Sequence, residues 1–170
     1  RTTERFDLIM LNLPDPATAQ LNRFYTKEFF KEVKGILNPD GVFALGLTSD
    51  ENYISEELKN FNGCIYKTLK EVFVSVAIVP GSHLLLFASN KQGILTYDTE
   101  LLGQRFMDRK IQTTYLDKYY FSYRLFPERI TFVKQALETY AGQANTDFYP
   151  KAYFYDLVFW ATQFYPSVRI

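Results

Sequence analysis

Two short β-type runs joined by one amphipathic helix constrain the fold of this chain more than any other feature. Residues 6–11 (FDLIML) and 42–47 (VFALGL) are almost entirely apolar. Between them, residues 27–37 carry apolar side chains at helical spacing, with Thr26 as the expected N-cap and the turn at 38–41 (NPDG) as the expected end. Strands joined through a helix run parallel, and parallel strands are typically buried on both faces. The segment therefore predicts a parallel α/β sheet.

The next segments extend this sheet and end it with a hairpin. A helix is expected near 51–72, with Ser49 or Asp50 as its cap, and β-rich runs follow at 73–79 and 83–88. Only a short Pro-Gly-Ser turn separates these two runs, so we expect them to pair antiparallel. This order matches the C-terminal half of the S-adenosylmethionine-dependent methyltransferase fold, which is a partial Rossmann-like sheet.

The rest of the chain is less regular and rich in aromatic residues. A helix is expected over 98–110, an extended aromatic stretch over 119–125, and a further helix from Pro127 to about 141. Residues 152–165 (AYFYDLVFWATQFY) predict a last helix.

These patterns divide the chain into three parts. Residues 1–95 are expected to form the C-terminal half of a methyltransferase-like α/β domain, 96–144 a helical or extended extension packed on it, and 145–170 an aromatic segment. The last helix is too short to span a bilayer, yet Tyr and Trp favour the membrane interface. Two interpretations of it stay open: a juxtamembrane helix, or a helix that packs on the domain or on a partner subunit.

Composition argues against several classes of function. The formal net charge is +0, so no global basic field would attract nucleic acid. Cys64 is the only cysteine, which rules out an intrachain disulfide, and it has no obvious histidine partner, so we expect an inert packed thiol. His83 is the only histidine, and no cluster has metal-ligand spacing, so no metal site is expected.

The polar loop at residues 12–16 (NLPDP) is the main candidate for a binding site. It follows the first strand, and open α/β sheets bind ligands at the carboxyl ends of their strands. Asp15 is the leading candidate for an amine-binding carboxylate, with capping of the turn as the alternative. Asn12 could donate to a ligand or cap the loop. Thr48 and Ser49, at the end of the second strand, could face the same crevice or cap the next helix.

This region resembles the spermidine and spermine synthases, and most closely the branch in which that domain is fused to membrane-spanning segments. The similar features run from an Asp-Pro loop, through an aromatic pair and a Glu-Phe-Phe helix, to a Pro-x-Gly turn: Asp15-Pro16, Phe24-Tyr25, Glu28-Phe29-Phe30 and Pro39-Asp40-Gly41. Val79-Pro80 and the strand at 84–89 are also similar, and residues 145–150 resemble the segment that precedes the membrane part in the fused branch. The resemblance covers most of residues 6–165.

The resemblance implies transfer of an aminopropyl group from decarboxylated S-adenosylmethionine to a diamine. The amine is protonated near neutral pH, so a carboxylate must accept its proton. The implied substrate-binding residues are Asp15, Asn12, Thr48, Ser49 and Tyr25. The nucleoside, decarboxylated S-adenosylmethionine or a similar molecule, would be held by the upstream half of the domain, so no cofactor is expected in this chain alone.

The sequence departs from the family pattern at three places. Asn12 occupies the position of the general-base Asp, and an amide cannot accept a proton at neutral pH. Gly46 replaces a Gln, and residues 79–81 (VPG) lack the family's Tyr. The chain also has no glycine-rich nucleoside loop. We therefore expect no catalytic residue and an inactive fragment; the alternative is a non-catalytic scaffold or ligand-sensing module of a membrane protein.

The expected partners follow from the same observations. They are the upstream half of the domain, a second copy of the chain through the exposed edge of strand 6–11, and a membrane surface near the C-terminal segment. Nucleic acid is not among them. The resemblance implies a location on the cytoplasmic side, as the soluble domain of a membrane protein.

Overall fold

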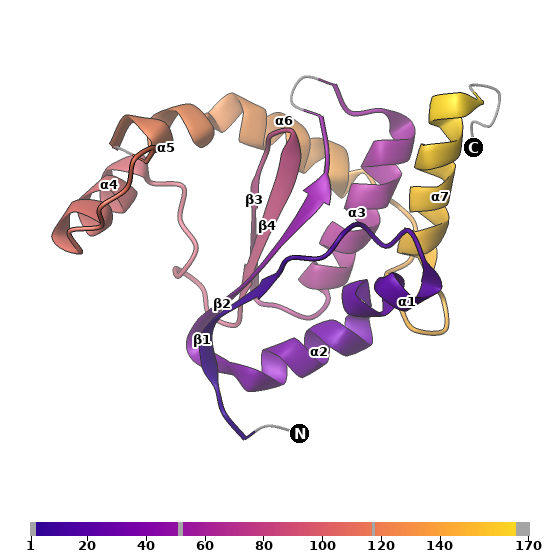
Figure 1. Cartoon of the computed structure of the whole chain (residues 1–170), viewed down its shortest axis with the longest axis horizontal. Helices are drawn as coiled ribbons and strands as arrows, with labels where there is room; N and C mark the ends of the chain where they lie inside the picture. The colour runs from indigo at the N-terminus through magenta and orange to yellow at the C-terminus, as the bar shows by residue number, and fades with distance from the viewer. Residues whose placement is uncertain (1–2, 51–52, 117, 166–170) are drawn as a thin grey trace.

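A four-stranded sheet forms the centre of the molecule. The computed structural model describes residues 3–50, 53–116 and 118–165, with the backbone alone for Lys118. The strands lie in the order β1-β2-β4-β3 (Figure 1). Their bounds are β1 Phe6–Leu11, β2 Leu37–Thr48, β3 Ser75–Val79 and β4 His83–Ser89. β1 pairs parallel with β2, while β4 pairs antiparallel with both β2 and β3. The expected parallel sheet with a closing antiparallel hairpin is thus confirmed.

Helices flank the sheet and extend the molecule at both ends. They are α1 Ala19–Asn22, the 3-10 turn Arg23–Tyr25, α2 Lys27–Ile36, α3 Glu56–Lys70, α4 Thr99–Asp108, α5 Lys118–Arg124, α6 Pro127–Glu138 and α7 Lys151–Phe164. The chain returns through α6 to α3, against which both α6 and α7 pack. In Figure 1, α4 and α5 lie at one end of the long axis and α7 lies at the other.

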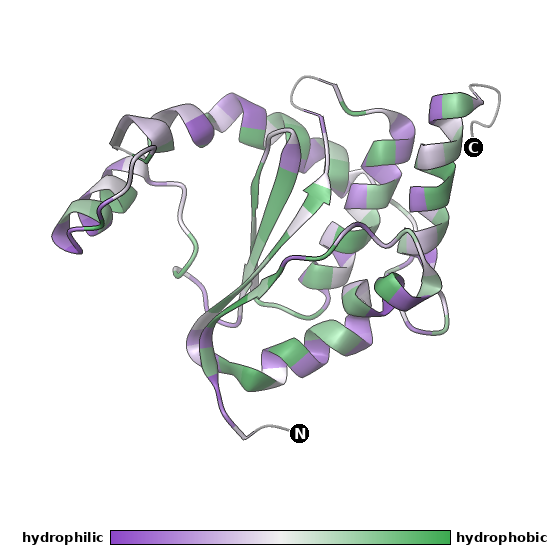
Figure 2. Ribbon diagram, in the orientation of Figure 1, coloured by the Kyte–Doolittle hydropathy of each residue, from purple (hydrophilic) through white to green (hydrophobic). Residues whose placement is uncertain are grey.

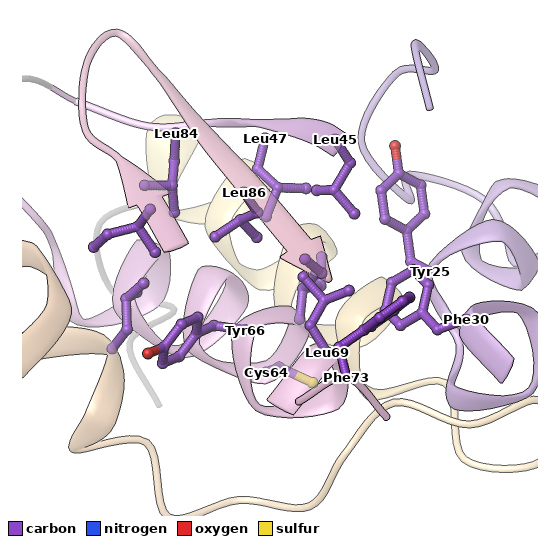
Figure 3. Packing of buried hydrophobic residues seen from close by; sticks show 14 of the residues in the cluster. Tyr25, Phe30, Leu45, Leu47, Cys64, Tyr66, Leu69, Phe73, Leu84 and Leu86 are labelled. Carbon is purple, nitrogen blue, oxygen red and sulfur yellow. The ribbon is translucent and has the colours of Figure 1, made fainter. Parts of the chain in front are cut away.

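The core lies between one face of the sheet and helices α2 and α3. Alternate residues of β2, among them Phe43, Leu45 and Leu47, point into it because successive side chains of a strand face opposite sides. Figure 3 shows Leu45 and Leu47 beside residues of β4 and above the helical layer. The Phe43 ring lies 5.6 Å from Phe30 on α2 and 6.0 Å from Phe73, so aromatic contacts join helix and sheet.

The second face of the sheet is only partly covered. Leu8 and Met10 on β1 are 55% and 69% exposed, so the expected burial of this strand on both faces is wrong for the chain as it stands. The strands are nevertheless hydrophobic along most of their length (Figure 2). Towards β3, residues 94–97 and helices α4 and α5 lie over this face, whereas nothing in the described ranges pairs with the outer edge of β1.

Two local predictions are wrong. Helix α3 begins after Ser55, whose hydroxyl accepts the Leu58 N–H at 3.1 Å, so neither Ser49 nor Asp50 is its N-cap. Ser55 is the better cap because Glu56 and Glu57 follow in the first turn, where acidic side chains stabilise the helix dipole.

The aromatic stretch expected to be extended is instead helix α5. Tyr and Phe favour strands only when a neighbouring strand is available, and here the neighbour is helix α4. Phe121 meets Phe106 of α4 edge to face at 6.0 Å. A helix satisfies its own backbone hydrogen bonds without a sheet partner, so it is the conformation that this environment favours.

Helix α7 buries part of its surface and exposes several aromatic residues. Ala152, Asp156 and Val158 are buried, whereas Phe154 and Trp160 are 43% and 60% exposed. Within the described ranges, no helix is both long enough and apolar enough to cross a bilayer. The packing interpretation therefore accounts for the buried residues of this segment and not for its exposed aromatic residues.

A single buried asparagine connects the N-terminal helices to α7. The Asn145 amide donates to Asn22 Oδ1 and to the Tyr25 carbonyl, each at 3.0 Å, and its own oxygen accepts the Ala152 N–H at 3.0 Å. The Asn145 backbone N–H donates to Thr68 on α3 at 2.8 Å. Every polar atom of this side chain thus has a partner, and the side chain lies at the junction of several elements.

Asn145→Ala is expected to destabilise the chain by about 2–4 kcal/mol, because it leaves several buried groups without partners. Urea unfolding followed by circular dichroism measures this loss. Gln143→Ala is the matched control, since the exposed Gln143 uses only its backbone carbonyl as an acceptor. Equal stability of the two variants would contradict the role given to Asn145.

Candidate functional site

A cleft of about 1200 Å³ opens where β1 and β2 end. One wall is the loop after β1 and another is α7, through Asp156, Phe159 and Trp160. The floor is the second face of the sheet, including Met10 and Phe87. The cleft therefore lies at the carboxyl ends of the parallel pair, where sheets of this kind bind ligands.

Tyr25 fixes the backbone of the loop from behind. Its hydroxyl donates to the Pro14 carbonyl at 2.8 Å and lies 3.2 Å from the Leu13 carbonyl. The ring is fully buried, and Figure 3 shows the hydroxyl pointing away from Phe30. Burial, and next the charges of Asp15 and Asp156, raise the pKa of Tyr25, so it remains a neutral hydrogen-bond donor.

Asp15 connects the ends of the two parallel strands. The Thr48 N–H, at the end of β2, lies 3.2 and 3.3 Å from the two carboxylate oxygens of Asp15. The Thr48 carbonyl in turn accepts the Asn62 amide at 3.3 Å. Asp15 therefore has a structural role, but its half-buried side chain still lines the cleft.

The structure brings together only some of the residues predicted from the loop. Asn12, Asp15 and Thr48 all line the cleft. Tyr25 lies behind the loop, and Ser49 is hydrogen-bonded through its backbone to Ser82 at 3.3 Å; neither is among the lining residues. The binding roles assigned to all five remain predictions.

Sequence reasoning missed Asp156, which is the second carboxylate of the cleft. It is 8% exposed and lies on α7 opposite the loop that carries Asp15. Burial, and next the negative charge of Asp15, raise the pKa of Asp156 from 3.8 to about 6. The available signal in the sequence was its setting, since Asp156 is an acidic residue inside the apolar and aromatic helical run 152–165.

Two other residues, Gly46 and His83, also line the cleft. Gly46 lies in its floor, where an added Cβ would meet Leu85 at an ordinary 3.5 Å, so a side chain could be accommodated there. His83 begins β4 as predicted and also lines the cleft. Within the described ranges, no three His, Cys, Asp or Glu side chains are grouped as a metal site would require.

Cys64 lies in the core and away from the cleft. It is fully buried, and burial raises the pKa of its thiol to about 11. Its sulfur lies 3.7 Å from the Gln143 carbonyl. A protonated, buried thiol is a poor nucleophile, which agrees with the predicted packing role.

A comparison with known families matches residues 1–93 to the spermine/spermidine synthase domain. Among curated relatives, the polyamine aminopropyltransferase of Oceanobacillus iheyensis is 44% identical over 48 residues, covering 28% of this chain and 9% of the relative. The polyamine aminopropyltransferase of Sulfolobus acidocaldarius is 36% identical over 77 residues, which cover 45% of this chain and 24% of the relative. The matched residues contain β1, α2 and β2 and the loop after β1, so the matched domain is an α/β domain. The chain belongs to the spermine/spermidine synthase family.

Solved structures support the same fold. A spermidine synthase in complex with the transition state analogue AdoDATO is 20% identical, with a TM-score of 0.52, and the match covers 79% of this chain and 43% of that chain. The spermidine synthase of Thermotoga maritima gives 20% identity, a TM-score of 0.51 and the same coverage. The Rossmann-like, methyltransferase-type fold is thus confirmed. This chain spans a quarter or less of the two curated relatives and under half of the two solved chains.

Asp156→Asn is expected to change how stability depends on pH. The pKa of Asp156 is higher in the folded chain than in the unfolded one, so the folded state binds the proton more tightly between about pH 4 and pH 6. The free energy of unfolding therefore falls as pH rises through that window. The Asn variant lacks this fall and should be more stable than the wild type by about 1–3 kcal/mol near neutral pH, with the difference approaching zero below about pH 4.

Urea unfolding across this pH range checks the expectation. Asp147→Asn, which removes an exposed carboxylate near the start of α7, is the control. Identical pH profiles for the two variants would show that Asp156 bears no buried charge.

Proposed function

We propose that this chain supplies the amine-binding side of an aminopropyl-transfer site. Asp15 is the observation that carries the proposal. It lies in the loop that resembles the family's Asp-x-x-Asp-Pro motif, at the carboxyl end of β1 and facing an acidic cleft. A carboxylate in that place can hold an alkylammonium group through a charge-assisted hydrogen bond.

The transfer needs more than this chain contains. The amine nitrogen attacks the carbon next to the sulfonium of decarboxylated S-adenosylmethionine, the carbon–sulfur bond breaks, and methylthioadenosine leaves with the electron pair. A base must take the proton that the nitrogen loses. Asn12 stands at the family's base position and cannot accept it, and no glycine-rich nucleoside loop is present in the sequence. We infer that the chain on its own binds amine but does not turn it over.

A second candidate is a non-catalytic module that senses a ligand or serves as a scaffold. Asn12 and Gly46 favour it, because both replace family side chains that would act on the amine. Titration of methylthioadenosine into a longer protein that includes the upstream half of the domain separates the two candidates. Binding supports an enzyme, whereas a folded protein that does not bind supports the non-catalytic module.

We also propose that the parent protein belongs to the membrane-fused branch, on the cytoplasmic side. The resemblance of residues 145–150 and the exposed aromatic residues of α7, such as Phe154 and Phe164, support this location.

The uncovered face of the sheet and the free edge of β1 support a covering partner, either the upstream half of the domain or a second copy. Light scattering of this chain should show a species larger than a monomer.

Asp15→Asn is expected to weaken putrescine binding by about tenfold or more, as the loss of a hydrogen bond to a charged group predicts. Isothermal titration calorimetry at low ionic strength measures the affinity. Glu128→Gln, which removes an exposed acidic side chain on α6, is the matched charge control. The proposal fails if the wild-type chain binds no amine, or if both variants bind as the wild type does.

With decarboxylated S-adenosylmethionine and putrescine present, the wild-type chain should release methylthioadenosine no faster than the same mixture does without the protein. Chromatography of the nucleoside product measures this rate. A clear rate above buffer would show that a group other than Asn12 accepts the proton.

A further inference from the structure

The two carboxylates of the cleft come from different parts of the chain. Asp15 belongs to the loop inside the family domain, whereas Asp156 belongs to α7, well beyond the matched residues 1–93. Both raise the pKa of Tyr25, after burial, so both lie within electrostatic reach of one hydroxyl. The fold therefore brings together two negative charges that the family match does not pair.

Asp156 lacks the partner that Asp15 has. Asp15 accepts the Thr48 N–H, but within the described ranges no hydrogen bond or ion pair reaches the Asp156 carboxylate. The residue is 8% exposed and lines the cleft, so its carboxylate is largely buried but can still be reached from the cleft. A buried carboxylate without a donor or counter-ion is costly, so the folded chain favours any cation that can reach it.

The surroundings suit an organic cation with an alkyl body. Among the described residues that line the cleft there is no Lys or Arg, and His83 is the one lining side chain that can carry a positive charge. Trp160 follows Asp156 by one helical turn on the same wall, and Met10 contributes apolar floor. An indole face attracts alkylammonium groups and methylene chains alike.

We propose that Asp156 is a specificity-determining residue that binds the second ammonium group of an alkyl diamine or polyamine while Asp15 binds the first, with Trp160 against the chain between them. This subsite rests on the proposed function, since it uses the same cleft. The subsite adds a role for α7, which lies outside the family domain: through Asp156, the affinity depends on how many ammonium groups the ligand carries.

The test compares putrescine with n-butylamine, which has the same carbon chain and one ammonium group. Calorimetry on the 170-residue chain should give about tenfold or greater preference for putrescine, since one hydrogen bond to a charged group separates the two ligands. Asp156→Asn should remove most of this preference, because it should lower the affinity for putrescine and leave the affinity for n-butylamine nearly unchanged. Asp147→Asn is the control and should keep the preference.

The outcomes separate the two proposals. If the wild type binds putrescine, Asp15→Asn weakens it and Asp156→Asn keeps the full preference, then the role of Asp156 is overturned and the amine site stands. If the wild type binds neither amine, both proposals fall. Unfolding is not expected to confuse the result, because removal of an unpaired buried charge should raise the stability of the Asp156 variant.

Discussion

The side-chain amide of Asn145 is the interaction on which the cleft depends. Its nitrogen donates to the Asn22 side chain at the end of α1 and to the Tyr25 carbonyl, and its oxygen accepts the Ala152 N–H in the first turn of α7. Tyr25 then holds the loop that carries Asp15, and α7 carries Asp156. One buried amide therefore links the two parts of the chain that carry the carboxylates of the cleft.

Much of the fold could be predicted because it follows local patterns. The strand pair around residues 6–47 and the hairpin at 75–89 follow from apolar runs, turn residues and short connections. The cap of α3 and the helical state of α5 could not be predicted as easily. The conformation of α5 depends on which neighbour is present, since the same aromatic stretch can pair as a strand or pack as a helix. The cap of α3 was a choice among nearby polar residues, of which Ser55 is the one followed by an acidic first turn.

One general rule predicted part of the candidate site. Ligands bind at the carboxyl ends of parallel strands, and that rule finds Asn12, Asp15 and Thr48. It cannot find Asp156, whose place beside Asp15 is decided by how α7 packs on α3 and α1. Nor can it show that Tyr25 acts behind the loop, because only the packed structure reveals which way its hydroxyl points.

The hydrogen bonds of Asn145 join residues that are far apart in the sequence, and this separation affects how the chain folds. Asn145 and Asn22 are separated by 123 positions, and contacts across so many residues are costly to close, so they form slowly compared with local ones. During synthesis, the strands and helices up to residue 89 can assemble while the cleft still lacks a wall. The cleft gains its second wall only when α7 packs, so its acidic lining is a late product of folding rather than a property of the sheet.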